Sequence, residues 1–346
     1  MKILIDMGHP AHVHLFKNFI WEMQKKGHEF KITGRDKDVT KQLLDAYQIP
    51  YELVGKMKPG KFNLFGEWIK RDIQILKIAR KFNPDILMGT LNPAIVHAAK
   101  ILGKKSIIFT DSEPEAVKFP IADLITVPFA DVIITLDSVR HCYGKKEVRV
   151  NSFKELAYLH PNWFTPNPKV LHDAGLGEDE DYIILRFVAW GAYHDVGRTG
   201  FDVNAKRRLL KELEKYGRIF ISSESKLPDE FEKFRLPIRP EQIHDLLYYA
   251  KLLVCDSQTM ATEAAILGTP VIRCNSFVGE KDMGNFLELE IKYDLMYNYS
   301  DSEIAIEKAI QLAQNGQSKE QWQRKCQRLF REKIDISTYL IHFISN

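Results

Sequence analysis

The sequence has few cysteines and lacks any long apolar run. Its four cysteines are scattered and form no CxxC pair, so we expect free thiols in a reducing cytoplasm. No run reaches about 18 apolar residues, which excludes a membrane-spanning segment on this criterion. The chain enters an apolar strand pattern at its second residue, without a leader of signal-peptide length. A cytoplasmic protein is therefore expected.

The sequence also lacks a strong charge of either sign, internal repeats and low-complexity tracts. Its 49 Lys and Arg residues nearly balance 46 Asp and Glu residues, and the net charge of +3 gives no reason to expect nucleic acid as a partner. The 346 residues, 45% of them apolar, are enough for two domains that each bury a core.

Strand and helix patterns alternate along most of the chain. Apolar stretches at 2–8, 84–90 and 130–136 predict strands, and 15–27 and 66–82 have apolar residues at helical spacing. The same alternation resumes after residue 181. Such alternation indicates parallel sheets with helices on both faces.

A stretch rich in proline, 156–170, interrupts this pattern and predicts a linker. We therefore predict an N-terminal domain at 1–155 and a C-terminal domain at 171–330. For 331–346 we predict a terminal helix, which either crosses back to the N-terminal domain or simply ends the chain. The expected fold class is α/β, with two doubly wound Rossmann-type domains whose parallel sheets face a central cleft.

Residues 250–275 contain the most informative pattern. A short apolar strand ends at Cys255, a polar turn follows, and a helix runs to about Gly268. In a parallel β-turn-α-β unit the N-terminus of this helix lies at the carboxyl edge of the sheet, where its N–H groups favour a phosphate. Glu263 lies one turn beyond Thr259, where its carboxylate could accept bonds from ribose hydroxyls. The alternative is a structural unit with a surface glutamate.

The segment DSQTMATEAAILGTPVI, residues 256–272, resembles the nucleotide-binding segment of GT-B glycosyltransferases of the MurG type. It is also similar to that of the non-hydrolysing UDP-N-acetylglucosamine 2-epimerases. The whole chain resembles the DUF354 family, which is placed in the GT-B superfamily. This resemblance implies a GT-B fold and a nucleotide-sugar donor, with UDP as the expected nucleotide and no cofactor or metal.

The turn after the first strand, Gly8 to His14, occupies the place of the glycine-rich turn and Gly-His-Val of MurG-type enzymes. On that match His12 is the candidate general base for the acceptor hydroxyl, because the pKa of histidine lies near the working pH. Gly8, His9 and His14 are predicted to contact the ligand, although His9, Pro10 and Ala11 replace the glycines of the pattern. Two alternatives are a metal site and histidines that only bond the loop backbone.

Two further stretches follow predicted strands in the C-terminal domain. In RFVAWGAYHDVG, residues 186–197, Arg186 is predicted to bind the pyrophosphate, and Trp190 and His194 are predicted to contact the base or the sugar. The alternative is that these side chains pack in the core. FVGEKDMGNFLELE, residues 277–290, resembles the segment of MurG-like enzymes that meets the donor sugar. The predicted sugar-contacting residues there are Glu280, Lys281 and Asn285, and the alternative is a charged helix start on the surface.

The N-terminal domain offers carboxylates at the same edge in FTDSEPEA, residues 109–116. Asp111 together with Glu113 or Glu115 could provide the acid and base groups that an epimerase needs. The alternative is that this stretch is a solvated acidic turn. Residues 56–71 interleave lysines with aromatic residues, which predicts either peripheral contact with an anionic membrane or a basic loop with packed aromatics.

Three functional hypotheses follow. The first is a GT-B-type glycosyltransferase that uses a nucleotide sugar, with UDP expected, in cell-envelope glycan or glycolipid synthesis at the inner membrane face. Its acceptor is unidentified, and a lipid-linked acceptor is one candidate. The second is an epimerase or hydrolase of a UDP-N-acetylhexosamine, and the third is a non-catalytic nucleotide-sugar-binding protein. The predicted catalytic residues are His12, Asp111 and Glu113. The predicted binding residues are Gly8, His9, His14, Arg186, Trp190, His194, Ser257, Gln258, Thr259, Met260, Glu263, Glu280, Lys281 and Asn285.

Overall fold

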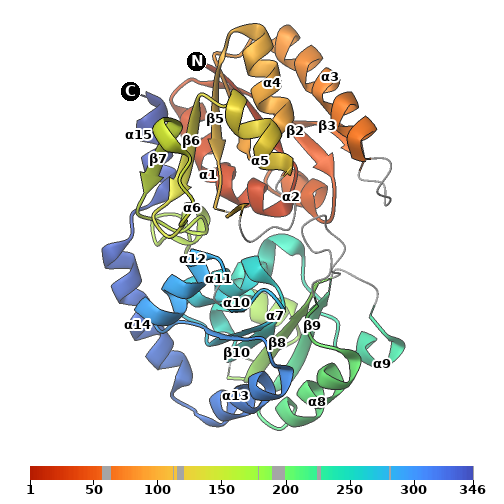
Figure 1. The fold of residues 1–346 in the computed structure, drawn as a ribbon. Helices are drawn as coiled ribbons and strands as arrows, with labels where there is room; N and C mark the ends of the chain where they lie inside the picture. Colours follow the sequence, from red (N-terminus) through yellow and green to blue (C-terminus); the bar gives the residue numbers. More distant parts are fainter. Residues whose placement is uncertain are drawn as a thin grey trace. The chain divides into compact units, whose positions relative to one another are not determined.

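The structure is a computed structural model that describes residues 1–56, 64–111, 113–114, 121–177, 179–188, 199–223, 227–279 and 282–345. The chain forms two compact units (Figure 1). Unit 1 comprises Met1–Trp163 with Ile334–Asn346, and unit 2 comprises Phe164–Lys333. Each unit is an α/β fold built on a parallel sheet.

Unit 1 contains a seven-stranded sheet among its described residues, in the order β3-β2-β1-β4-β5-β6-β7. All neighbouring strands in it are parallel. The central strand β1 is buried on both faces, which explains its continuous apolar run. The strands are β1 (Lys2–Met7), β2 (Glu29–Asp36), β3 (Tyr51–Lys56), β4 (Ile86–Thr90), β5 (Lys105–Phe109), β6 (Val132–Leu136) and β7 (Glu147–Val150).

Helices cover this sheet (Figure 1). Helices α3 and α4 lie side by side and pack with one another, whereas α1 packs against α6 and α15. Apolar residues of α3 and α4, among them Ile75 and Ile95, share a buried cluster with Leu4 of β1. The helices are α1 (Pro10–Lys25), α2 (Thr40–Ala46), α3 (Leu64–Phe82), α4 (Pro93–Leu102), α5 (Ile121–Thr126), α6 (Leu156–Leu159) and α15 (Ile336–Ser345).

Unit 2 contains a five-stranded parallel sheet among its described residues, in the order β12-β11-β10-β8-β9. Its strands are β8 (Tyr182–Phe187), β9 (Arg218–Ser223), β10 (Leu252–Cys255), β11 (Val271–Cys274) and β12 (Tyr297–Tyr299). Its helices are α7 (Lys169–Asp173), α8 (Val203–Leu213), α9 (Asp229–Glu232), α10 (Ile243–Tyr249), α11 (Gln258–Ile266), α12 (Gly284–Leu287), α13 (Ser302–Gln314) and α14 (Ser318–Glu332).

The strand order of each sheet reverses at one place. In unit 1 the chain progresses outward in opposite directions from β1 and β4, and in unit 2 from β8 and β10. Open parallel sheets bind ligands at such a reversal, because the loops beyond the two strand ends diverge and leave a crevice at the carboxyl edge. The segments that follow these four strands are therefore the places to look for a site.

Two local expectations are corrected by the structure. The expected loop at 9–14 is the beginning of α1, because the side chain of His9 accepts the N–H of Ala11 and Pro10 supplies a favourable first helical residue. Part of the expected linker, Leu156–Leu159, is the buried helix α6 of unit 1. The division between the units falls after Trp163.

The last helix, α15, is held in unit 1 by Asp335. Its carboxylate accepts the backbone N–H groups of Ser337 and Thr338 at 3.0 and 3.1 Å and the indole N–H of Trp163 at 2.7 Å. Burial alone would raise the pKa of this carboxyl, but bonds from Thr338, Trp163 and Asn162 outweigh burial and lower it. In the described residues, no helix is long and apolar enough to cross a membrane.

Replacing Asp335 by alanine should therefore destabilise unit 1 by roughly 2–3 kcal/mol, since it removes both a helix cap and the acceptor for the half-buried indole N–H of Trp163. Urea unfolding would measure the change. Asp301→Ala is the matched control, because Asp301 caps α13 by accepting the N–H groups of Glu303 and Ile304. It should cost about 1 kcal/mol. Equal losses for the two variants would contradict the assignment.

Candidate functional site

The reversal in unit 2 brings Arg186 and the start of α11 to neighbouring strand ends. Arg186 of β8 is in register with Cys255 of β10, and Asp256 and Ser257 follow Cys255 directly. The guanidinium of Arg186 donates from Nη1 to the hydroxyl of Ser222 on β9 at 2.9 Å. A cation and a helix N-terminus therefore lie at one edge of the sheet, an arrangement that suits an anion.

Helix α11 begins and ends as its sequence indicates. Ser257 is the N-cap, and its hydroxyl accepts the N–H of Met260 at 3.4 Å. Gly268 follows the helix with a φ of 68°, and a β-carbon there would lie 3.1 Å from the Cα of Gln323 on α14. Residues Met260 to Ile266 are all buried, so alanines suit a helix enclosed on every side. Gln258 and Thr259 are half-buried at its first turn.

Glu263 is buried rather than on the surface. One of its carboxylate oxygens, Oε1, lies 3.0 Å from Nε2 of His244 on α10, and the residues are 5% and 3% exposed. A carboxylate this deeply buried is stable only with hydrogen-bond partners, and His244 supplies one. The sequence interpretation named Glu263 but did not identify His244, which lies 19 positions away.

Asp256 is a second buried acid at the same edge, and the sequence interpretation did not name it. Its carboxylate accepts the N–H of Val188, just after β8, at 2.8 Å. A β-carbon built on Gly200 would overlap with this carboxylate, so only glycine fits there. The signal available in the sequence was an acidic residue directly after an apolar strand and directly before a helix cap.

Asn285 precedes Phe286, whose ring packs on a buried cation of β11, Arg273. Arg273 is fully buried, pairs with Asp282, donates from Nε to Asn298 at 2.7 Å and lies 3.6 Å from the centre of the Phe286 ring. Burial lowers the pKa of Arg273 and raises that of Asp282. The side-chain oxygen of Asn285 is buried and has no hydrogen-bond partner among the described residues. Such an atom is an acceptor for a ligand or a water.

The reversal in unit 1 places His12 beside Thr90. The N–H of Gly8 donates to Nδ1 of His12 at 3.2 Å, so the neutral ring carries its proton on Nε2, which lies 2.8 Å from Oγ1 of Thr90. Burial and the charge of Lys154 lower the pKa of His12 to about 4. The imidazole is thus neutral at physiological pH. It is also a weaker base than the ordinary pKa of histidine led us to expect. Both of its nitrogens contact other groups of the chain.

The two predicted carboxylates of unit 1 are each paired with a cation. Asp111 accepts a bond from Lys154 at 2.6 Å, and the side chain of Asp111 is 22% exposed. Glu113 is buried, and its carboxylate accepts bonds from Nε and Nη2 of Arg140 at 3.0 and 2.8 Å. The alternative of a solvated acidic turn therefore does not describe Glu113. Glu115 lies outside the described residues.

An acid that the sequence interpretation did not name, Asp6, connects four elements of unit 1. This fully buried carboxylate on β1 accepts bonds from Thr33 of β2 and Arg71 of α3, both at 2.6 Å. It also accepts a bond from the amide of Asn92, whose own oxygen caps α4 by accepting the N–H of Ala94. Arg71 is therefore buried in this network and is not part of a basic surface loop.

The other two histidines of the first turn have different surroundings. His9 caps α1, and its ring centre lies 5.8 Å from that of His12. His14 is buried and packs against the rings of Tyr47 and Tyr158. Residues two apart on a helix point in nearly opposite directions, so His12 and His14 cannot share one ligand. Within the described ranges no group of three His, Cys, Asp or Glu side chains is placed to hold a metal ion.

Several predicted residues lie outside the part of the chain that the structure describes. These are Trp190, His194, Glu280 and Lys281. The predicted membrane-facing stretch 56–71 is described in part, at Lys56, which ends β3, and from Leu64 of α3 onward. On that helix Lys70 is exposed and Ile69 is 47% exposed.

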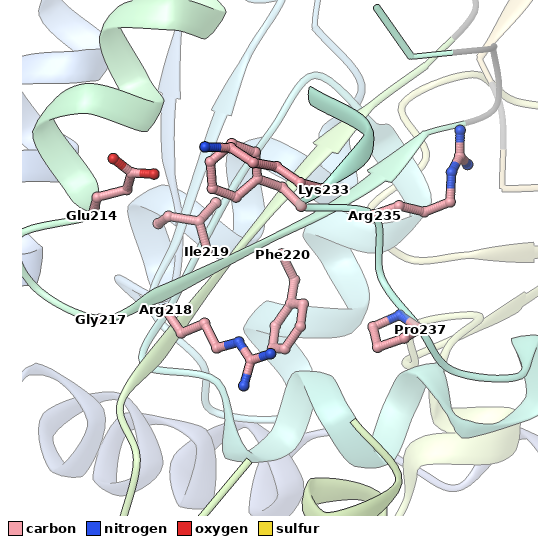
Figure 2. A pocket seen from close by; sticks show the side chains of 9 residues that line it. Glu214, Gly217, Arg218, Ile219, Phe220, Lys233, Arg235 and Pro237 are labelled. Atoms are coloured by element: carbon pink, nitrogen blue, oxygen red, sulfur yellow. The ribbon is translucent and has the colours of Figure 1, made fainter. Parts of the chain in front are cut away.

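A surface hollow of about 590 Å³ in unit 2 is separate from these residues (Figure 2). It lies along β9 and the following segment, and Figure 2 shows Arg218 and Phe220 among the side chains that line it. None of the residues predicted from the sequence contributes to it. It therefore gives no support to the predicted site.

Two α/β units with parallel sheets define a protein of the GT-B fold class, as predicted, and solved structures agree with this assignment. The UDP-GlcNAc 2-epimerase of Neisseria meningitidis, solved with bound UDP-GlcNAc, is 15% identical with a TM-score of 0.68. The spinosyn rhamnosyltransferase SpnG is 12% identical with a TM-score of 0.65. Each similarity covers 100% of both chains and establishes the fold.

The chain belongs to the family described as "Protein of unknown function (DUF354)", whose model matches residues 1–339. The predicted family membership is thereby confirmed. A relative in Methanocaldococcus jannaschii, the uncharacterized protein MJ0665, is 21% identical over 285 residues, which are 79% of this chain and 82% of the relative. The family and this relative carry no assigned reaction in their descriptions.

The surroundings of His12 predict how it titrates. Its pKa should be about 4 instead of 6.5, so the unfolded chain binds more protons between these pH values. The resulting stability should be complete above pH 6.5 and be lost as the pH falls toward 4. Lys154→Met should raise the His12 midpoint in an NMR titration, because it removes a nearby positive charge. Lys37→Met, which removes a weaker contribution, should raise it less. A midpoint that Lys154→Met leaves unchanged would refute this cause.

Proposed function

We propose that the protein is a glycosyltransferase that uses a UDP-linked sugar as donor. The observation that carries this proposal is the buried Glu263 on α11, held at the strand reversal of unit 2 behind a serine-capped helix N-terminus. The first N–H groups of α11 and the guanidinium of Arg186 would bind the diphosphate. Glu263 would accept the ribose hydroxyls.

The described groups around the diphosphate site also suit departure of a nucleoside diphosphate. As the bond to the sugar breaks, negative charge grows on the diphosphate, and a helix N-terminus and a cation that are already in place stabilise it without reorganisation. The unpartnered oxygen of Asn285 would accept a bond from a sugar hydroxyl. Lys281 remains a further candidate for the leaving group, although the structure does not describe it.

His12 is the proposed base for the acceptor hydroxyl. Its ring is neutral at physiological pH and has a lone pair that can accept a proton, and the lowered pKa makes it a weaker base than an ordinary histidine. Its lone pair is on Nδ1, where it accepts the N–H of Gly8 at 3.2 Å, so the acceptor hydroxyl must displace a long hydrogen bond. Oγ1 of Thr90, which lies 3.0 Å from Nδ1 and 2.8 Å from Nε2, would help to hold the ring in place.

The acceptor is proposed to be a cell-envelope glycan or glycolipid. Support comes from α3, where Ile69 and Ile73 are about half exposed beside the exposed Lys70. Apolar and cationic side chains on one helix suit an anionic membrane surface that presents a lipid-linked acceptor.

Epimerisation of a UDP-N-acetylhexosamine is the second candidate. The observation in its favour is Asp111, a partly exposed carboxylate bonded to Lys154, since both contribute to the electrostatic environment of His12. These groups provide an acid, a base and a cation for proton transfer at a sugar carbon. Glu113 contributes less to this candidate, because Arg140 occupies its carboxylate.

One incubation separates the two reactions. UDP-GlcNAc alone should remain unchanged with a transferase and should give the 2-epimer with an epimerase, as measured by chromatography. With a panel of UDP-sugars, a transferase should release UDP only when a lipid extract is added, whereas a hydrolase should release UDP without the extract. His12→Ala should abolish this release and leave UDP affinity within about twofold, since only unit 2 residues are proposed to bind UDP. Full turnover by His12→Ala would exclude it as the base.

Glu263→Gln should weaken UDP binding by roughly 10- to 100-fold, because a hydrogen bond to a charged group contributes about 1.5–3 kcal/mol. Isothermal titration calorimetry would measure the dissociation constant. Glu307→Gln, at an exposed position on α13, is the control and should bind UDP like the unaltered protein. Undiminished UDP affinity in Glu263→Gln would remove the central observation behind the proposal.

A further inference from the structure

A buried histidine next to Glu263 has no role in the reaction proposed above. His244 lies on α10, a helix that packs against α11 within unit 2. It is 3% exposed, and its Nε2 atom lies 3.0 Å from Oε1 of Glu263. The pair is therefore formed by the protein without any ligand.

The hydrogen bond restricts the orientation of the carboxylate. A glutamate side chain has three rotatable bonds, and the terminal rotation is broad unless a partner fixes it. Here the backbone of Glu263 is fixed in the middle of a fully buried helix, and His244 fixes the far end of its side chain. Both ends of the side chain are thus held before a nucleotide arrives, which reduces the ordering cost on binding.

A carboxylate has about four lone-pair positions on its two oxygens, and the bond from His244 uses one on Oε1. A ribose presents two adjacent hydroxyl donors, and a pair of donors is bound most tightly by acceptors that are held in a fixed relative position. Loss of one hydroxyl leaves a buried polar group unpaired, which is costly. Orientation of the carboxylate therefore determines how strongly a site distinguishes ribose from deoxyribose.

We propose that His244 is a positioning residue that orients Glu263 and thereby makes the nucleotide site selective for ribonucleotides over 2′-deoxyribonucleotides. This inference rests on the proposed function, since it takes Glu263 as the ribose contact. His244 itself touches no substrate. It acts through the orientation of the neighbouring carboxylate.

The test compares UDP with 2′-deoxy-UDP by isothermal titration calorimetry on the full chain. The unaltered protein should bind UDP at least tenfold more tightly. His244→Asn should reduce this ratio to about threefold or less, mainly by weakening UDP, because the asparagine amide is too short to reach the place of Nε2. His244→Gln should restore most of the ratio, since its amide nitrogen can occupy that place. His172→Leu, an exposed histidine on α7, is the control and should keep the full ratio.

Two results would overturn the inference alone. One is that His244→Asn leaves the preference for UDP over 2′-deoxy-UDP unchanged while Glu263→Gln removes this preference. The other is an equal loss of affinity for both nucleotides in His244→Asn and His244→Gln, which is what a purely structural role predicts. If the unaltered protein binds neither nucleotide, the proposed function fails and the inference fails with it. The asparagine and glutamine variants keep a polar group at the site, so the comparison does not depend on burying an apolar replacement.

Discussion

Buried charge needs a partner, and this constraint organises the carboxyl edges of both sheets. Asp6 is paired with Arg71, Glu113 with Arg140, Arg273 with Asp282 and Glu263 with His244. Removing one member of such a pair leaves an uncompensated charge in a poorly solvated place, which costs several kcal/mol. Pairing holds such an acid in one orientation, both where it supports neighbouring elements, as Asp6 does, and where it is proposed to contact a ligand, as Glu263 is.

In unit 1 this requirement distinguishes Asp6, which holds the structure together, from His12, which is a candidate for catalysis. Asp6 accepts bonds from residues of β2 and α3 and from the residue that caps α4, so its carboxylate fixes the strand ends around it. His12 lies at the same reversal, with a neutral ring and long or neutral hydrogen bonds. A neutral ring with weak partners can exchange them for a substrate, whereas the Asp6 network cannot be opened without exposing a buried ion pair.

Much of the fold could be predicted from the sequence because its signals are local. Alternating apolar strands and helices indicated parallel sheets, and the polar turn from Ser257 to Thr259 before a run of helix formers indicated where α11 begins. Residues that depend on distant partners could not be identified in this way. Arg71 lies 65 positions from Asp6, and no local pattern shows that it is buried with that acid instead of exposed in a basic loop. The helical start at Pro10, which separates the directions of His12 and His14, was missed because three histidines and a proline are typical of a loop.

The sequence by itself determined the fold class, the family resemblance and the candidate edge at the start of α11, since each depends on residues close together in the chain. Only the tertiary structure decided that Glu263 is buried against His244, that Glu113 is occupied by Arg140 and that the ring of His12 is neutral. The physical reason is that burial and electrostatic pairing depend on distances in space. Residues tens of positions apart set those distances, and only the packing of the helices on the sheets brings them together.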